Sequence, residues 1–364
     1  MTPAVPAPTP PPSPTTPSAT VTPLRPTATA TATVTVQPTP SATPQGPPPL
    51  ALRQWPAMQP KEWPRPERDN GLGIHFLPQQ YYSDKELDYG ISRMNEMGLR
   101  WALVLYGDEN HLERAARKFK QAGIMVVWRK ALRSYESYYG WERDIKLLQS
   151  LGVAPYMQVY NEPELAEEWD GRPISPTLYM DTFLQASRDI YNAGGFVGLQ
   201  FIQPEWLVNA LQALKARRGE AIFGRMFFIP HPYGLNHPPE YQEDPNGVLG
   251  FLRFADIFRQ EIGFVPPMIA GEGGWKYKAQ DDKRFPVVDD RLHREYHVAV
   301  FDWFRSGNLS NGQPLPDYLL AFCPWLLFGG DAAVWVDGFE GTRTLTIDAV
   351  KSMSAFVRRF SWEQ

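Results

Sequence analysis

The sequence predicts an α/β fold, a (β/α)8 TIM barrel preceded by a disordered segment rich in proline and threonine. Two observations support this prediction. The first fifty residues hold 16 of the 37 prolines, no aromatic residue and one charged side chain, Arg25, a composition that cannot form a packed core. From residue 71 onward, short apolar runs alternate with longer amphipathic runs, which is the pattern of parallel strands joined by helices.

Three parts follow from these observations. We expect a disordered Pro/Thr-rich linker over residues 1–50, an extension over residues 51–70 and the barrel itself over residues 71–364. The extension carries four prolines and two tryptophans, Trp55 and Trp63. Because it directly precedes the first strand candidate, we expect it to pack across the N-terminal end of the barrel rather than to form a domain.

Eight apolar runs are the strand candidates. They begin near residues 71, 99, 124, 153, 196, 226, 265 and 319, and each is apolar on both faces, as expected for a strand covered by helices. Runs with helical periodicity lie at 84–97, 111–122, 141–150, 177–192, 248–262, 291–304 and 347–360. Several of them end at a glycine, a common helix terminator. Eight strand-helix units in about 290 residues match the size of a (β/α)8 barrel.

The sequence lacks the motifs of three other folds that bind nucleotides or hydrolyse esters. A dinucleotide-binding fold needs GxGxxG after its first strand, but Gly71-Leu-Gly73 continues as Ile-His-Phe with no third glycine. Neither a GxSxG nucleophile turn nor a GxxxxGK[ST] phosphate loop occurs. The sequence therefore argues against an esterase or a kinase.

The charge, the hydropathy and the cysteine and histidine patterns argue against several kinds of binding partner. The formal net charge is -4, and without a basic run we expect no nucleic-acid partner. No uncharged apolar run is long enough to span a bilayer, so we expect no membrane insertion.

Cys323 is the only cysteine and lies in an apolar run, which indicates buried packing. His293 and His297 have neither the glutamate spacing of a zinc helix nor a third ligand, so we expect no metal and no cofactor.

The N-terminal segment suggests where the protein acts. Met1 leads directly into a Pro/Thr tract without the basic and apolar regions of a signal peptide. Such tracts form stiff spacers that tether extracellular modules. We therefore expect an extracellular or cell-surface location, with an upstream domain or a surface anchor joined through this linker.

Two strand candidates end in a glutamate. The fourth ends in Asn161-Glu162-Pro163, and the seventh ends in Gly271-Glu272-Gly273. Reacting groups in (β/α)8 barrels lie at the C-terminal ends of strands, so both carboxylates should face the barrel mouth. A pair of carboxylates on opposite walls suits glycoside hydrolysis, in which one protonates the leaving oxygen and the other attacks or stabilises the sugar carbon.

These two motifs in these positions resemble the clan A glycoside hydrolases, the cellulase-like retaining enzymes of the family 5 and 39 type, over roughly residues 71–364. The resemblance implies that Glu162 is the acid/base, Glu272 the nucleophile and Asn161 a donor to the sugar 2-hydroxyl. For these roles the pKa of Glu162 should be raised by burial and by the charge of Glu272, while hydrogen bonds keep Glu272 ionised.

The resemblance extends to the sixth and eighth strands. Tyr233 is similar to the tyrosine that holds the nucleophile in clan A enzymes, and His231 should face the same space. Trp325 is similar to the tryptophan beneath the sugar at the cleavage site, because an indole face packs on the C–H face of a sugar. One departure leaves the substrate open: the third strand ends in Trp128-Arg129-Lys130, without the histidine-containing signature of many cellulase-like members.

Position alone adds further candidates for substrate binding. His75 and Arg129 end the first and third strand candidates, and Trp275 follows the seventh. The aromatic residues expected to supply stacking subsites around the mouth are Tyr135, Tyr138, Tyr139, Trp141, Trp169, Trp206, Trp275 and Tyr277. An aromatic mouth favours an oligosaccharide over a small polar metabolite.

Three hypotheses remain open at this point. The first is a retaining glycoside hydrolase that cleaves β-linked oligo- or polysaccharide with two glutamates and no cofactor. The alternative is a non-catalytic carbohydrate-binding barrel tethered to the cell surface, and the third is a structural module. The relative placement of Glu162, Glu272 and Tyr233 distinguishes between them.

Overall fold

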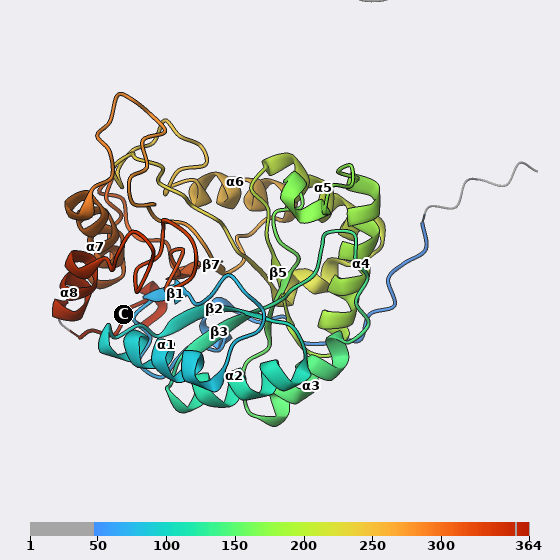
Figure 1. Cartoon of the computed structure of the whole chain (residues 1–364). Helices are drawn as coiled ribbons and strands as arrows, with labels where there is room; N and C mark the ends of the chain where they lie inside the picture. Colours follow the sequence, from blue (N-terminus) through green and yellow to red (C-terminus); the bar gives the residue numbers. More distant parts are fainter. Residues whose placement is uncertain (1–46, 354, 364) are drawn as a thin grey trace, which may run out of the picture. The chain divides into compact units, whose positions relative to one another are not determined.

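The computed structural model describes residues 47–353 and 355–363. Eight parallel strands lie side by side in chain order, and a bridge between Leu72 and Phe322 closes the ring. Helices form an outer layer around the strands (Figure 1). The predicted (β/α)8 barrel is confirmed. The predicted disorder of the linker falls almost entirely on residues outside the described range.

The strands are β1 (Gly73–His75), β2 (Trp101–Tyr106), β3 (Met125–Lys130), β4 (Tyr156–Val159), β5 (Phe196–Leu199), β6 (Met226–Phe228), β7 (Met268–Ala270) and β8 (Leu319–Phe322). The helices are α1 (Asp84–Glu96), α2 (Glu109–Gln121), α3 (Trp141–Ser150), α4 (Pro176–Asn192), α5 (Pro204–Ala216), α6 (Phe251–Ile262), α7 (Asp290–Ser306) and α8 (Thr344–Ser352). None of these described helices combines the length and apolar character that crossing a membrane requires.

Successive side chains of a strand point alternately into the barrel and outward to the helices, so both faces of each strand are buried and apolar. On β2, Trp101, Leu103 and Leu105 fill the barrel interior, whereas Ala102, Val104 and Tyr106 pack outward in the larger core. Cys323 is buried in the interior, as its apolar run predicts. A closed barrel with helices outside it leaves no strand face in water.

The chain enters and leaves the fold at the N-terminal end of the barrel. Trp63 is buried there, with its ring 4.7 Å from that of Phe196 and 5.9 Å from that of Tyr156, the first residues of β5 and β4. The ordered body also starts before residue 51, because the backbone N–H of Leu50 donates to the carbonyl oxygen of Arg217 at 2.7 Å. The predicted linker boundary is therefore a few residues too late.

The last helix is shorter than predicted. It ends at Ser352, and the described residues from 355 to 360 are not helical. Arg358 explains the difference, because its backbone N–H donates to the carbonyl oxygen of Asp69 and its guanidinium donates to that of Leu320 at 3.2 Å. These tertiary hydrogen bonds hold the segment across the end of the barrel. A continued helix would not bring Arg358 to these partners.

Two buried histidines on α7 should make the fold sensitive to acid. His297 is fully buried beside the rings of His293 and Trp335, and desolvation lowers its pKa to about 4. Because the unfolded chain takes up the proton at a higher pH, the stability contributed by neutral His297 is complete above about 6.5 and is lost as the pH falls to about 4. We expect a loss of roughly 3 kcal/mol over this window.

Urea unfolding of His297→Gln between pH 4 and 7 checks this expectation. The variant should show a shallower fall of unfolding free energy with decreasing pH than the wild type. The difference between the two proteins at pH 7 is the reference, because His297 of the wild type is neutral there and this difference measures the lost packing alone. Equal slopes for His297→Gln and the wild type would contradict the assignment.

Candidate active site

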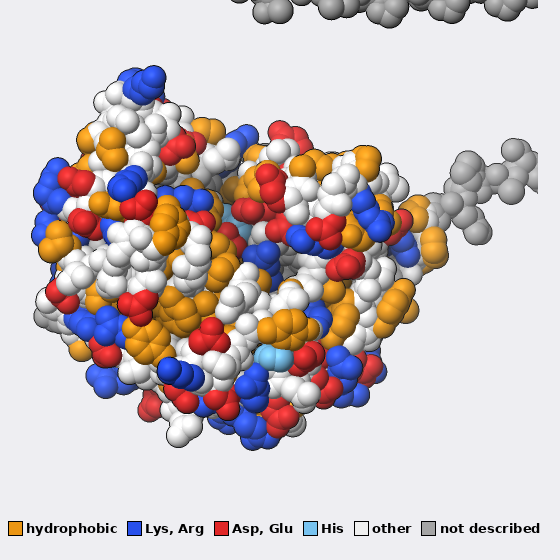
Figure 2. All heavy atoms as spheres, viewed as in Figure 1, with side chains coloured by type: hydrophobic (Ala, Val, Ile, Leu, Met, Phe, Trp, Pro, Cys, Tyr) orange, Lys and Arg blue, Asp and Glu red, His pale blue; other side chains and the backbone are white. Residues whose placement is uncertain are grey.

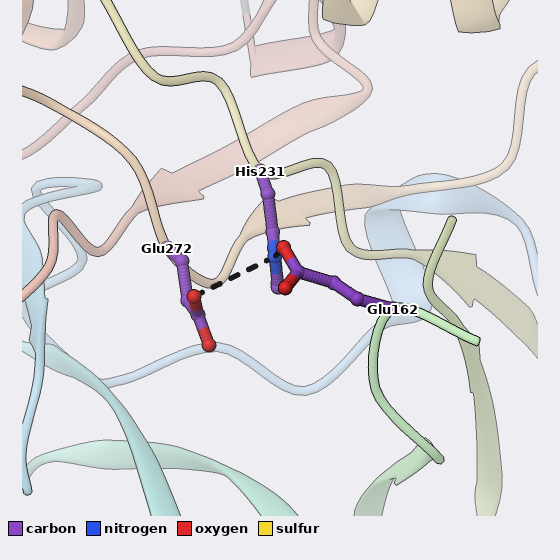
Figure 3. Close-up of side chains that lie close together, drawn as sticks. All are labelled: Glu162, His231 and Glu272. Atoms are coloured by element: carbon purple, nitrogen blue, oxygen red, sulfur yellow. Dashed lines mark hydrogen bonds and ion pairs between the residues drawn. The ribbon is translucent and has the colours of Figure 1, made fainter. Parts of the chain in front are cut away.

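Three polar side chains meet at the C-terminal end of the barrel. Glu162 follows β4, His231 follows β6 and Glu272 follows β7. Figure 3 shows the three side chains reaching toward one another from these separate segments. One ligand atom from each residue lies within 4.8 Å of the other two. The predicted convergence of Glu162 and Glu272 is thus present in the structure.

The Glu162 loop is held in an unusual backbone conformation. Tyr160 and Glu162 have φ values of 57° and 33°, in the left-handed region that non-glycine residues adopt only when other contacts hold them there. The backbone N–H of Glu162 donates to the side-chain oxygen of Gln200, and the buried indole of Trp169 donates to the carbonyl oxygen of Pro163 at 2.9 Å. These contacts fix the direction of the Glu162 carboxylate.

Glu164 ties the same loop to β5 and α5. One carboxylate oxygen accepts hydrogen bonds from the backbone N–H groups of Ile202 and Gln203 at 3.1 and 3.2 Å. Burial raises the pKa of Glu164 to about 7 despite these bonds. The segment from Asn161 to Glu164 is therefore anchored on both sides of Glu162.

The glycines that flank Glu272 permit its close packing. A Cβ on Gly271 would lie 2.5 Å from the side chain of Leu103, inside the barrel. A Cβ on Gly273, whose φ is 128°, would lie 2.5 Å from the carbonyl oxygen of Pro232. The Gly-Glu-Gly sequence thus lets the ends of β6 and β7 approach each other with Glu272 between them.

Glu272 is surrounded by donors and positive charge. The Tyr233 hydroxyl donates to one carboxylate oxygen at 3.0 Å, and the Arg129 guanidinium donates to the other at 3.1 Å. The Nε2 atom of His75 lies 3.7 Å from that second oxygen. The structure therefore brings together Glu272, Tyr233, Arg129 and His75, which are all residues proposed from the sequence.

The pKa shifts of Glu162 and Glu272 are opposite to those expected from the sequence, which were a raised pKa for Glu162 and an ionised Glu272. Burial acts to raise the pKa of Glu162, but the hydrogen bond and charge of His231 outweigh it and the net pKa is lowered. Burial raises the pKa of Glu272, with the charge of Glu162 adding to it against the effects of His231, Arg129 and Tyr233. The ring of His231 therefore accounts for the lowered pKa of Glu162, since its Nδ1 lies 2.7 Å from Glu162 and 3.6 Å from Glu272.

His231 itself lies between two carboxylates. Its burial opposes protonation, but the charge of Glu272 and the hydrogen bond to Glu162 dominate, and the pKa of His231 is raised. The raised pKa of His231 and the lowered pKa of Glu162 both favour an ion pair between the imidazolium and the carboxylate. By contrast, burial and the positive charge of Arg129 lower the pKa of His75, which stays neutral.

Trp325 and Asn161 complete the surroundings. Trp325 follows β8, its indole is partly exposed, and its ring lies 4.3 Å from that of His75. Asn161 is buried and its amide donates to a carboxylate oxygen of Glu168 at 2.8 Å, while its oxygen accepts a hydrogen bond from Gln158. Trp325 is thus open to a ligand, whereas Asn161 already has protein partners.

Three of the eight aromatic residues expected at the mouth are core residues. Trp275 is fully buried, and its indole donates to the carbonyl oxygen of His237 at 2.7 Å. The prediction that Trp275 binds substrate is therefore contrary to the structure, because Gly273 and Gly274 turn the chain inward beneath Gly234. Trp141 and Trp169 are also fully buried, and Tyr139 is the most exposed member of the predicted group.

Two residues that position the site were not found from the sequence. Glu168 accepts hydrogen bonds from both Asn161 and Arg129, and Gln200 holds the backbone of Glu162. Gln200 follows β5 directly, so its place after a strand is a usable signal. Glu168 lies in the short helix η2 (Ala166–Trp169), and nothing in the local pattern marks it.

Glu162, His231 and Glu272 are close enough to bind one metal ion. The Arg129 guanidinium already pairs with Glu272 at 3.1 Å, and His231 Nδ1 already forms a hydrogen bond with Glu162 at 2.7 Å. A metal ion at this position would have to replace the His231–Glu162 hydrogen bond and would lie close to the positive charge of Arg129.

Comparisons with known proteins support the fold. No protein-family model and no curated protein matches the sequence. Among solved structures, a monomeric β-xylosidase from Caulobacter crescentus CB15 matches with a TM-score of 0.53 and 16% identity, over 81% of this chain and 70% of that chain. A GH39 enzyme from Xanthomonas axonopodis pv. citri matches with a TM-score of 0.50 and 15% identity, over 81% and 68%. The chain therefore has the (β/α)8 barrel fold of these glycoside hydrolases, as the sequence resemblance implies.

Proposed function

We propose that this protein is a retaining glycoside hydrolase that cleaves β-linked oligo- or polysaccharide by double displacement. The observation that carries the proposal is the approach of Glu162 and Glu272, which have carboxylate oxygens within 4.8 Å of each other. Retaining enzymes hold their two carboxyl groups about 5–5.5 Å apart, whereas inverting enzymes need about 6.5–9.5 Å to admit a water molecule. The similar β-xylosidase folds support the same activity.

In the first step, Glu272 attacks the anomeric carbon of the sugar. The bond between that carbon and the glycosidic oxygen breaks, and its electron pair goes to the oxygen, which takes a proton from Glu162. The 2.7 Å hydrogen bond between His231 Nδ1 and Glu162 provides the path by which a proton passes from the imidazole to the carboxylate. Arg129 and Tyr233 orient Glu272 for attack.

In the second step, water hydrolyses the covalent intermediate. Glycosylation of Glu272 removes one negative charge next to Glu162, and Glu162 now accepts a proton from water. The hydroxide attacks the anomeric carbon, the bond to Glu272 breaks and the β configuration is restored. The partly exposed face of Trp325 supports the sugar during both steps. The Pro/Thr-rich composition of residues 1–50 favours a glycan outside the cell as the target.

Hydrolysis of a panel of aryl β-glycosides tests the proposal. β-Xylosides are the first choice because of the similar β-xylosidase folds, followed by β-glucosides and other β-linked sugars. The proton NMR spectrum of the first product should show the β anomer. Binding of sugars without hydrolysis of any glycoside would instead support the non-catalytic carbohydrate-binding alternative.

Removing the Tyr233 hydroxyl should slow the reaction. Tyr233→Phe deletes one hydrogen bond to the buried carboxylate of Glu272, and a bond to a charged group contributes about 1.5–3 kcal/mol. We expect kcat to fall about 10- to 100-fold in steady-state assays. Tyr89→Phe is the matched control, because its hydroxyl also donates to a carboxylate, that of Asp337 at 2.8 Å, but on an exposed surface. Equal activity of both variants would contradict the role given to Tyr233.

A further inference from the structure

An apolar cavity opens beside Glu162. It has a volume of about 550 Å³, and its walls come from the loops after β4, β5, β6 and β7 and from the start of α6. Figure 2 shows the hollow on this face, with charged side chains at its border. The apolar side chains that line it are Leu165, Phe201, Ile202, Leu235, Phe251 and Phe254.

The cavity lies on one side of the reacting pair. Glu162, His231 and Tyr233 line it. His75 and Arg129 lie beside Glu272, Trp325 packs against His75, and none of these three belongs to the lining. In double displacement the sugar that is attacked lies over the nucleophile, and the leaving group lies next to the acid that protonates it. The geometry therefore places the sugar over Glu272 and Trp325, and the leaving group in the cavity.

The lining selects the chemistry of that leaving group. The walls formed by Phe201, Phe251 and Phe254 offer no hydrogen-bond donor or acceptor to a ligand. Sugar hydroxyls buried against these three rings would lose their hydrogen bonds to water without replacement. Besides Glu162 and His231, the charged side chains of the lining are Lys276, Asp244 and Asp281.

Hydrogen bonds of Asn236 connect the two loops that line one side of the cavity, the loops after β6 and β7. Asn236 is fully buried, and its amide donates to the carbonyl oxygens of Asp282 and Phe285 at 2.7 and 3.2 Å. Its side-chain oxygen accepts from the backbone N–H of Asp282 at 2.9 Å. These hydrogen bonds join the loops after β6 and β7, and both loops contribute residues to the lining of the cavity.

We propose that this cavity is a leaving-group site for an apolar, aryl-sized aglycone, so that the enzyme cleaves glycosides of aromatic alcohols as well as β-linked glycans. This inference rests on the proposed glycosidase activity and names the substrate class of the same site. A volume of about 550 Å³ falls in the range of sites for small organic molecules, about 300–1,000 Å³, and admits more than one aromatic ring.

Leaving groups of similar acidity but different size provide the test. For one sugar, kcat/KM of the 2-naphthyl β-glycoside should exceed that of the phenyl β-glycoside about five- to tenfold, because the second ring buries additional apolar area. Leu165→Asn and Ile202→Asn should bring this ratio close to one. Leu178→Asn is the matched control, since Leu178 is 41% exposed on α4 and does not line the cavity, so it should keep the wild-type ratio.

The outcomes separate this inference from the proposed function. Hydrolysis of both glycosides with a ratio near one, or with equal ratios in all variants, would overturn the leaving-group assignment and leave the glycosidase intact. Failure to hydrolyse any glycoside would overturn both. Binding of 2-naphthol, measured by saturation-transfer NMR on each variant, gives a readout independent of hydrolysis, and we expect Leu165→Asn to weaken it several-fold. Equal binding by Leu165→Asn and Leu178→Asn would also overturn the inference.

Discussion

Replacing Glu272 with glutamine is expected to reduce the hydrolysis of aryl β-glycosides by roughly 10⁴-fold or more. Glutamine has nearly the same shape and keeps an oxygen that can accept hydrogen bonds from Tyr233 and Arg129, but it cannot form the covalent bond to the sugar. The loss should appear in kcat for every leaving group, because the attack on the sugar is removed whatever departs. Stopped assays over long incubations measure the residual rate.

Two controls make this result specific. Glu261→Gln removes a carboxylate that pairs with Lys215 at 3.1 Å, on the last turn of α6, and it should retain full activity. Thermal unfolding should show that Glu272→Gln remains folded, since the substitution also removes a charge that is repelled by Glu162. A folded Glu272→Gln variant with more than a few per cent of wild-type activity would exclude Glu272 as the nucleophile.

Replacing Glu162 with glutamine should give a loss that depends on the leaving group. Without the acid, glycosides of poorly acidic alcohols should react about 10²- to 10⁴-fold more slowly. A dinitrophenyl glycoside needs little protonation of its leaving oxygen, so its first step should be nearly unaffected. Burst kinetics with this substrate should then show slow hydrolysis of the accumulated intermediate, because the base for the second step is also missing.

Azide provides the complementary readout for Glu162. In Glu162→Ala, the small anion fits the space left by the carboxylate and attacks the intermediate without a base. We expect azide to accelerate turnover and to give a glycosyl azide of β configuration. Failure of azide to change the rate or the product, in a folded variant that accumulates the intermediate, would contradict the acid/base role.

The positions of the carboxylates were predictable because strand ends are visible in the sequence. Glu162 and Glu272 each follow an apolar run, and parallel strands in a barrel deliver such residues to one mouth. His231 and Tyr233 were found in the same way. The fold was predictable for a related reason, since the alternation of strand and helix patterns extends over the whole barrel.

Residues beyond the strand ends were predicted less well. Trp275 lies three residues after Glu272, and two intervening glycines reverse the chain and bury the indole, which the strand pattern does not encode. Glu168 acts through its contacts with Asn161 and Arg129, but it lies in the short helix η2 and not at the end of a strand. The lowered pKa of Glu162 depends on the ring of His231, whose Nδ1 lies 2.7 Å from Glu162 and 3.6 Å from Glu272, and the strand pattern does not encode such side-chain positions.

Trapping the glycosyl-enzyme intermediate tests the central claim most directly. A dinitrophenyl 2-deoxy-2-fluoro-β-glycoside of the preferred sugar should inactivate the wild type. The fluorine slows both the formation and the hydrolysis of the glycosyl-enzyme, whereas the good leaving group speeds only its formation, so the intermediate accumulates. Mass spectrometry of the digested protein should then place one sugar on the peptide that contains Glu272, and none on Glu272→Gln. A sugar attached to any other residue, or steady turnover to an α-configured product without an adduct, would contradict double displacement through Glu272.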